Sequence, residues 1–401
     1  MALGSGIVFA SRVGAQTTVI PSVSLSEKYD SNIFRTTISS IPPGRQKWDF
    51  ITVAGVTVAV ANKSRLGNSN LWARVDGNAF VYNSDMSFYS TNVFASSDLT
   101  QGVSELVRGL KLRISDSFRY TPEAPAFLTG GHPDDTADVY SRGIQGVRAN
   151  TYKNVLLANS DYSLTRSFSL TTNYAYSIFR RGNIDATVTS VTPVAYFNNT
   201  NHSVDFGPTY MFDGGDTLYI KYNYVAGESK SEDTGETTNY VFQTLAPVYV
   251  TKAVVPGWTL TMSGGATLVE QAGNRAFMSG KLGLATDIER RTHVQMWVSR
   301  QPNPSFFGTS SALISNVAQF TVSHGLSRLL RMTVSGYYGY NETTPVKTYA
   351  SRTVRGTVAL DYSLTQSTML SLSQDYNYYE YTGALPFDRI VTMLTLRTEW
   401  Q

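Results

Sequence analysis

The sequence predicts an all-β protein: a transmembrane, antiparallel, up-and-down β-barrel of about 18 strands, with 16 strands as the nearest alternative. Three observations lead to this fold class. Apolar side chains recur with a period of two, the connections alternate between long and short, and aromatic residues gather at the ends of the periodic segments. We expect one barrel domain over residues 16–401, preceded at 1–15 by a segment that resembles the end of a secretory signal.

The period of two is clear in segments such as "WTLTMSGGATLV" (258–269), where Trp258, Leu260 and Met262 alternate with small polar residues. Successive side chains of a strand point to opposite faces, so this pattern indicates one apolar and one polar face. Scanned along the chain, the pattern predicts 18 strands and no long helix. The strands are expected near 17–30, 47–60, 70–82, 86–99, 104–120, 146–164, 167–178, 200–213, 216–227, 236–251, 257–270, 274–288, 292–301, 314–325, 331–341, 348–363, 368–381 and 388–400.

The connections give a second signal. From the fifth predicted strand onward, long segments at 121–145 and 179–199 alternate with short ones at 165–166 and 214–215. Outer-membrane barrels have short periplasmic turns and longer external loops, so this alternation is typical of them.

Strands of this kind can face either a protein core, as in a large secreted β-protein, or lipid. The predicted strands of roughly 10–16 residues exceed the usual length of about 5–6 and suffice for a tilted crossing of a bilayer, which needs about 9–11. Aromatic residues near strand ends would then lie at the membrane interfaces. We expect this for Phe118, Tyr120, Phe212, Trp258, Tyr378 and Trp400. In the secreted alternative these rings would be buried in a core.

Composition narrows the function. Charged residues make up 16% of the chain, below the typical value of about a quarter, and the formal net charge of +3 gives no reason to expect a nucleic-acid partner. The absence of cysteine excludes disulfides and thiol nucleophiles. The four histidines have no metal-ligand spacing. We therefore expect no catalytic, metal or cofactor site. From the strand pattern described above, we expect outer-membrane lipid to surround the barrel.

A resemblance to a known family lies in several segments. The first predicted strand, "PSVSLSEKYDSNIF" (21–34), ends in an E-x-Y-D-x-N element. Its residues are Glu27, Tyr29, Asp30 and Asn32. With the Y-x-Y endings at 174–176 and 222–224 and the strand-turn-strand segment 360–381, it resembles the β-barrel porins of the second type found in exopolysaccharide operons of Gram-negative bacteria. The resemblance implies an outer-membrane location, passage of a secreted polysaccharide and a periplasmic export component as partner.

Charged residues on the polar strand faces should point into the lumen, because a charge facing lipid costs about 2–4 kcal/mol at the midplane. We expect this orientation for Glu105, Lys111, Arg113, Arg119, Lys221, Arg331 and Arg397. The basic ones would attract anionic solutes or the carboxylates of an acidic polysaccharide. Tyr219 and Tyr337 share this face, where they would either stack on sugar rings or fill space.

The leading hypothesis is a monomeric barrel that serves exopolysaccharide export. A general or anion-selective diffusion porin is the first alternative. The second is a structural or adhesive surface barrel with a plugged lumen.

Overall fold

The structure is a computed structural model. It describes residues 16–34, 41, 43–122, 149–184, 197–231, 235–252, 256–270, 273–289, 291–304, 312–345, 347, 349–382 and 385–400. The expected secretory-signal segment at 1–15 lies outside the described residues. Within these described ranges, no helix is both long and apolar enough to cross a bilayer.

Eighteen strands and two short helices make up the described chain. The first nine strands are β1 (Gln16–Asp30), β2 (Asp49–Ser64), β3 (Gly67–Phe80), β4 (Phe88–Asp98), β5 (Leu110–Thr121), β6 (Ala149–Ser163), β7 (Phe168–Ile184), β8 (Phe197–Met211) and β9 (Thr217–Ser231). The others are β10 (Thr237–Thr251), β11 (Trp258–Val269), β12 (Arg275–Ile288), β13 (Thr292–Pro304), β14 (Ala312–Gly325), β15 (Leu330–Thr344), β16 (Ala350–Ser363), β17 (Thr368–Tyr381) and β18 (Phe387–Glu399). The helices are η2 (Ser84–Met86) and α1 (Thr100–Leu106).

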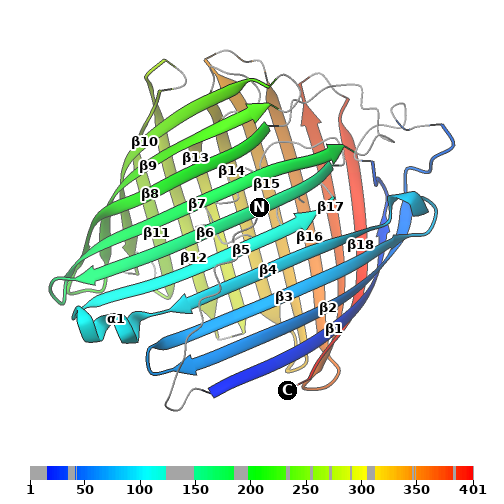
Figure 1. Cartoon of the computed structure of the whole chain (residues 1–401), viewed down its shortest axis with the longest axis horizontal. Coiled ribbons are helices and arrows are strands. Elements are labelled where there is room, and N and C mark those ends of the chain that lie inside the picture. Colours follow the sequence, from blue (N-terminus) through cyan, green and yellow to red (C-terminus); the bar gives the residue numbers. More distant parts are fainter. Residues whose placement is uncertain are drawn as a thin grey trace.

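The strands form one closed barrel (Figure 1). Each strand pairs antiparallel with its neighbours in sequence, and β18 returns to pair with β1. The closing register runs from Ser22 opposite Glu399 to Asp30 opposite Val391. A closed barrel leaves no unpaired strand edge, which hydrocarbon would not tolerate. The predicted all-β barrel with 18 strands is therefore confirmed, and the alternative of 16 strands is wrong.

The two faces of the sheet differ in the size and polarity of their side chains. On β1, Ser22, Ser24 and Ser26 are 4%, 7% and 5% exposed, whereas the larger Val23 and Leu25 between them are 41% and 54% exposed. A curved sheet crowds the side chains on its concave side and spreads those on its convex side, so the serines point inward. Residues paired across strands point to the same face. The register therefore defines an inward face and an outward face for all eighteen strands.

Tight turns join the strands at one end of the barrel. In the β6–β7 turn, the Thr165 hydroxyl accepts the amide hydrogens of Ser167 and Phe168 at 3.2 and 3.0 Å, and Thr365 makes the same bonds in the β16–β17 turn. Threonine hydroxyls favour turns because they bond to the backbone two or three residues onward. We call this the short-turn end, and the opposite end, which carries the longer connections, the long-loop end.

The expectation of one continuous strand over 104–120 is wrong. Residues Thr100–Leu106 form α1, and β5 begins only at Leu110. Gly109, with φ of +88°, turns the chain between them, and a Cβ there would lie 2.8 Å from the carbonyl oxygen of Ser163. Only glycine meets both conditions easily.

Glu105 consequently lies on α1 and not on a strand. Its carboxylate is 3.3 Å from the guanidinium of Arg65 in the β2–β3 turn, and both side chains are exposed. The backbone amide of Gly102 also donates to the carbonyl oxygen of Leu66, which ties α1 to that turn. The period-two argument for an inward orientation does not apply to Glu105.

Part of the E-x-Y-D-x-N element lies on the seam where β1 meets β18. The Asp30 carboxylate and the Arg389 guanidinium form an ion pair, with Arg389 Nε donating to Asp30 Oδ1 at 2.9 Å. Their side chains are 1% and 9% exposed. The side-chain amide of Asn32 donates to the carbonyl oxygen of Asp388 at 3.1 Å. Asp30 and Asn32 thus join the two ends of the chain across the closing pair of strands.

Glu27 and Tyr29 of the same element point outward, because they alternate with the inward serines and Asp30. The Glu27 carboxylate accepts the hydroxyl hydrogen of Thr52 at 2.9 Å. The Tyr29 ring lies 5.3 Å from that of Phe50 and 6.2 Å from that of Trp48. An outward aromatic group therefore lies next to the seam at the long-loop end.

The six aromatic residues expected at membrane interfaces fall at the two ends of the barrel. Phe118 and Tyr120 on β5 and Tyr378 on β17 lie toward the long-loop end, and register places all three on the outward face. At the short-turn end, Trp258 begins β11. Phe212 directly follows the end of β8, and Trp400 directly follows the end of β18.

Candidate transport pathway

The inward face of the barrel is polar and is cross-linked by ion pairs. On β3, Arg74 donates from Nε to the Asp76 carboxylate at 2.8 and 2.9 Å and from Nη2 to the Ser24 hydroxyl at 3.0 Å. The arrangement needs glycine at position 55, because a Cβ there would lie 2.3 Å from Asp76 Oδ1. Charges that line a lumen are tolerated because water and opposite charges replace lost hydration.

Three of the basic residues expected in the lumen have acidic partners. Arg113 Nε donates to Asp98 at 3.0 Å, and Lys221 Nζ lies 2.8 Å from Asp205. Arg397, opposite the inward Ser24, pairs with Glu399. These pairs largely cancel the charge of each basic group, so they offer less attraction to an anion than the sequence suggests.

The other three basic residues have no such partner. Lys111 and Arg119 alternate with Leu112 and Phe118 on β5, so they share the inward face with Arg113. Arg331 is the second residue of β15, at the short-turn end. Among the described residues, the side chains of Lys111, Arg119 and Arg331 take part in no hydrogen bond or ion pair. Their charges are therefore available to solutes.

Two aromatic side chains lie between Lys111 and Arg119 on the inward face. Trp72 on β3 and Phe94 on β4 are cross-strand partners whose rings stack at 6.2 Å with an interplanar angle of 30°. Phe94 is in turn opposite Ser117, in the row next to Arg119 toward the short-turn end. We call Trp72, Phe94, Lys111 and Arg119 the β3–β5 track. It presents cations and aromatic rings in succession along the barrel wall.

The inward tyrosines expected from the sequence lie close to the wall. A Cβ at Gly207 would be 3.1 Å from the Tyr219 ring, and one at Gly339 would be 2.5 Å from Tyr337 Oη. Each ring therefore lies over a glycine. Tyr219 Oη is buried and has no hydrogen-bond partner among the described atoms. This geometry favours a wall-filling role for the two tyrosines.

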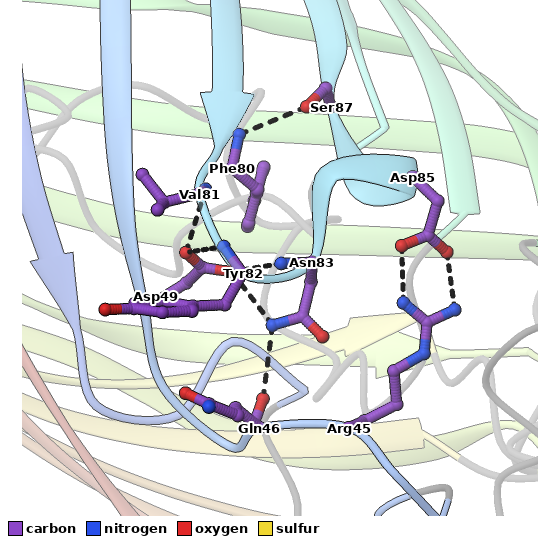
Figure 2. A network of polar contacts seen from close by, with 9 residues as sticks. All are labelled: Arg45, Gln46, Asp49, Phe80, Val81, Tyr82, Asn83, Asp85 and Ser87. Carbon is purple, nitrogen blue, oxygen red and sulfur yellow. Dashed lines mark hydrogen bonds and ion pairs between the residues drawn. The ribbon is translucent and has the colours of Figure 1, made fainter.

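Two loops pack against the inward face at the long-loop end (Figure 2). The carboxylate of Asp49 accepts the amide hydrogens of Val81, Tyr82 and Asn83 at 3.0, 3.0 and 2.8 Å, and the side-chain amide of Asn83 at 2.8 Å. In the same region, Arg45 of the β1–β2 loop forms an ion pair with Asp85 of the β3–β4 loop, in which two guanidinium nitrogens donate to the two carboxylate oxygens.

Beneath these polar contacts is a buried apolar cluster of Phe34, Ile51, Phe80 and Met86. Ile51 and Phe80 are cross-strand partners on the inward face of β2 and β3, whereas Phe34 and Met86 come from the loops. The loops thus occupy part of the lumen at its long-loop mouth.

Replacing Asp49 with alanine is expected to loosen this mouth. The backbone amides of Tyr82 and Asn83 would lose the carboxylate as acceptor, and buried donors left unpaired cost about 1–3 kcal/mol each. The Val81 amide and the Asn83 side chain would keep the carbonyl oxygens of Phe50 and Gln46. Single-channel recordings should show larger and noisier currents, and protease should cut the segment 81–87 faster. Asp85→Ala, which removes the ion pair with Arg45 and keeps the Asp49 carboxylate, is the control. Equal currents for Asp49→Ala and the unaltered protein would show that the loops do not limit the pathway.

Several residues of the pathway were not foreseen. Trp72 shares its face with Asn70 and Arg74, and an aromatic ring on a polar strand face was a signal that could have been used. Nothing in the sequence pattern marks Asp49, Asp98 or Asp205 as residues that hold a loop or pair with a lumen cation. The described part of the chain contains no group of three or more acidic or histidine side chains that could hold a metal ion.

A closed 18-stranded barrel with an apolar outward face and a polar inward face defines a transmembrane β-barrel of the Gram-negative outer membrane. In this class the short turns face the periplasm and the long loops face outward from the cell.

Solved structures of similar fold include outer-membrane proteins of Pseudomonas aeruginosa. The ferric enterobactin receptor PfeA, solved as a mutant with enterobactin, has a TM-score of 0.50 and 8% identity, over 97% of this chain and 82% of that one. OpdK, solved with vanillate, has a TM-score of 0.46 and 11% identity, over 95% of this chain and 99% of that one. No protein-family profile and no curated protein sequence matches the chain. The likeness concerns the fold alone.

Proposed function

We propose that the barrel is a conduit through which an acidic polysaccharide leaves the cell. The observation that carries the proposal is the β3–β5 track, where unpaired Lys111 and Arg119 flank the stacked Trp72 and Phe94. Cations attract sugar carboxylates, and flat apolar ring faces suit the C–H faces of sugars. Water-filled space between these contacts would let the polymer slide, because each contact is individually weak.

The proposed conduit acts as a monomer that receives the polymer from a periplasmic export component. It carries out no catalysis and needs no cofactor. Its surroundings are outer-membrane lipid, with the long loops outside the cell. The resemblance to exopolysaccharide-operon porins supports the choice of substrate.

A second candidate, an anion-selective diffusion porin, is favoured by a different observation. The apolar cluster of Phe34, Ile51, Phe80 and Met86 takes up space inside the mouth, which suits small solutes better than a polymer. Unpaired inward cations would give such a porin its preference for anions.

Gene deletion and planar-bilayer recording separate these functions. Under the export proposal, deletion stops polysaccharide secretion, and a copy carrying Trp72→Ala and Phe94→Ala restores ion conductance without restoring secretion. Unchanged secretion after deletion, with anion-selective conductance, would replace export by diffusion. A barrel that passes no current would indicate a plugged, structural or adhesive protein.

A further inference from the structure

Two arginines interrupt the outward face near the long-loop end. Cross-strand pairing from β12 to β16 places Gly280, Arg300, Asn316, Tyr340 and Arg352 in one row on that face. We call it the arginine row. A charge on the lipid side is costly at the midplane and tolerated near an interface, so two arginines there call for an anionic partner.

Both guanidinium groups have donors to spare. Arg300 Nη1 donates to Asn316 Oδ1 at 2.8 Å, which uses one of its five N–H groups. Arg352 lies over the Tyr378 ring at 5.9 Å from its centroid, and its Nη1 is 3.8 Å from the Glu380 carboxylate. Half of the Arg352 side chain is exposed.

Of the two carboxylates near the row, Glu380 is the distant partner of Arg352, and Glu342 is hydrogen-bonded by other groups. Glu342, in the next row toward the long loops, lies 2.7 Å from Lys347 Nζ and accepts the Tyr340 hydroxyl hydrogen at 3.0 Å. The remaining donors of the two arginines have no hydrogen-bond acceptor among the described residues.

An apolar hollow of about 400 Å³ lies directly below the arginine row. Its lining includes the next two outward rows toward the membrane centre, which are Leu282, Val298, Ala318, Tyr338 and Val354, followed by Leu284, Met296, Phe320 and Gly336. Of the inward-facing rows, the hollow is lined only by the row between these two outward rows, which is Gly283, Trp297, Gln319, Tyr337 and Arg355. The inward-facing rows above and below it do not line the hollow. The hollow therefore opens on the outward face, with the backbone of that single inward row as its floor.

Small residues create the hollow. The Phe320 ring lies across Gly336, where a Cβ would be 2.2 Å from the ring, and Ala318 next to it leaves further space. Hydrocarbon chains fill apolar hollows on a lipid-facing surface at no cost in hydration. A cationic row above an apolar hollow matches an amphiphile with an anionic head and acyl chains.

We propose that the outward face of β12–β16 is a binding site for lipid A, the membrane anchor of lipopolysaccharide. The site lies toward the long-loop end, hence in the outer leaflet, where lipid A is the main lipid. Arg300 and Arg352 are three strand spacings apart, or roughly 14–15 Å. Lipid A carries two phosphates at opposite ends of a disaccharide, whereas a phospholipid carries one. Arginine forms strong charge-assisted hydrogen bonds with phosphate, and an acyl chain would lie in the hollow.

Native mass spectrometry of the detergent-purified barrel tests this site with three probes: bisphosphorylated lipid A, monophosphorylated lipid A and phosphatidylglycerol. The unaltered protein should bind the bisphosphorylated form most tightly. Arg300→Gln combined with Arg352→Gln should weaken that binding roughly tenfold or more, since each loses charge-assisted hydrogen bonds to phosphate. Arg352→Gln alone should abolish the preference for two phosphates over one.

Two further variants complete the test. Arg180→Gln, which removes another outward arginine near the long-loop end, should leave binding unchanged. Ala318→Leu should weaken binding by filling the hollow while preserving the charge. Equal binding of phosphatidylglycerol would assign the face to phospholipid, and binding that survives loss of both arginines would overturn the site. A dimer dispersed by the same double variant would instead make the face a contact between two copies.

Discussion

Replacing Arg389 with alanine is expected to lower the free energy of unfolding of the barrel by about 3–5 kcal/mol, because it leaves the buried Asp30 carboxylate without its cation. The loss falls on the β1–β18 pair, where the closure of the whole barrel depends on strands from opposite ends of the chain. Urea unfolding in detergent micelles, followed by the heat-modifiable gel shift, measures the change.

Two comparisons isolate the seam. Arg65→Ala removes an exposed ion pair with Glu105 and should cost no more than about 1 kcal/mol. Asp30→Asn combined with Arg389→Met removes both charges and should recover a large part of the stability, since the uncompensated carboxylate is then gone. If Arg389→Ala unfolds at the same urea concentration as the unaltered protein, the ion pair does not hold the seam.

For the E-x-Y-D-x-N element, the sequence predicts the face on which each side chain lies but not its partner. Alternation predicts that Glu27 and Tyr29 lie on one face and Asp30 on the other. It does not identify Arg389 as the partner of Asp30, because these residues are 359 positions apart. Only closure of the barrel brings them together.

The fold itself was predictable because lipid and water impose the same two-sided pattern on every strand. The prediction at 104–120, which placed a strand where α1 lies, has a physical cause. The spacing of Glu105 and Lys111 fits a strand by coincidence, whereas Gly109 requires a turn that alternation alone does not reveal.

The sequence likewise does not reveal which basic side chains in the lumen are paired with acidic ones. A strand pattern predicts that Arg113 and Lys221 share the polar face, but their partners depend on the register with neighbouring strands. Asp98 and Asp205 cancel much of these charges, and α1 separates Asp98 from Arg113 along the chain. That Lys111, Arg119 and Arg331 keep their charges unpaired therefore emerges only from the structure.

This distinction between paired and unpaired cations yields a test of selectivity. Lys111→Gln combined with Arg119→Gln is expected to lower the permeability of chloride relative to potassium about two- to fourfold at low salt. Two charges acting on an ion at roughly 10 Å in water contribute about 0.4 kcal/mol each before screening. Reversal potentials across a planar bilayer under a potassium chloride gradient measure the ratio.

The matched control removes an equal number of charges without changing the net charge. Arg113→Gln combined with Asp98→Asn eliminates one ion pair on the same strands, so the reversal potential should stay close to that of the unaltered protein. A further drop in salt should widen the gap between the two double variants, because less screening strengthens unpaired charges most. If both double variants shift the reversal potential equally, ion pairing on the wall does not decide which cations the solute meets, and the β3–β5 track loses its electrostatic role.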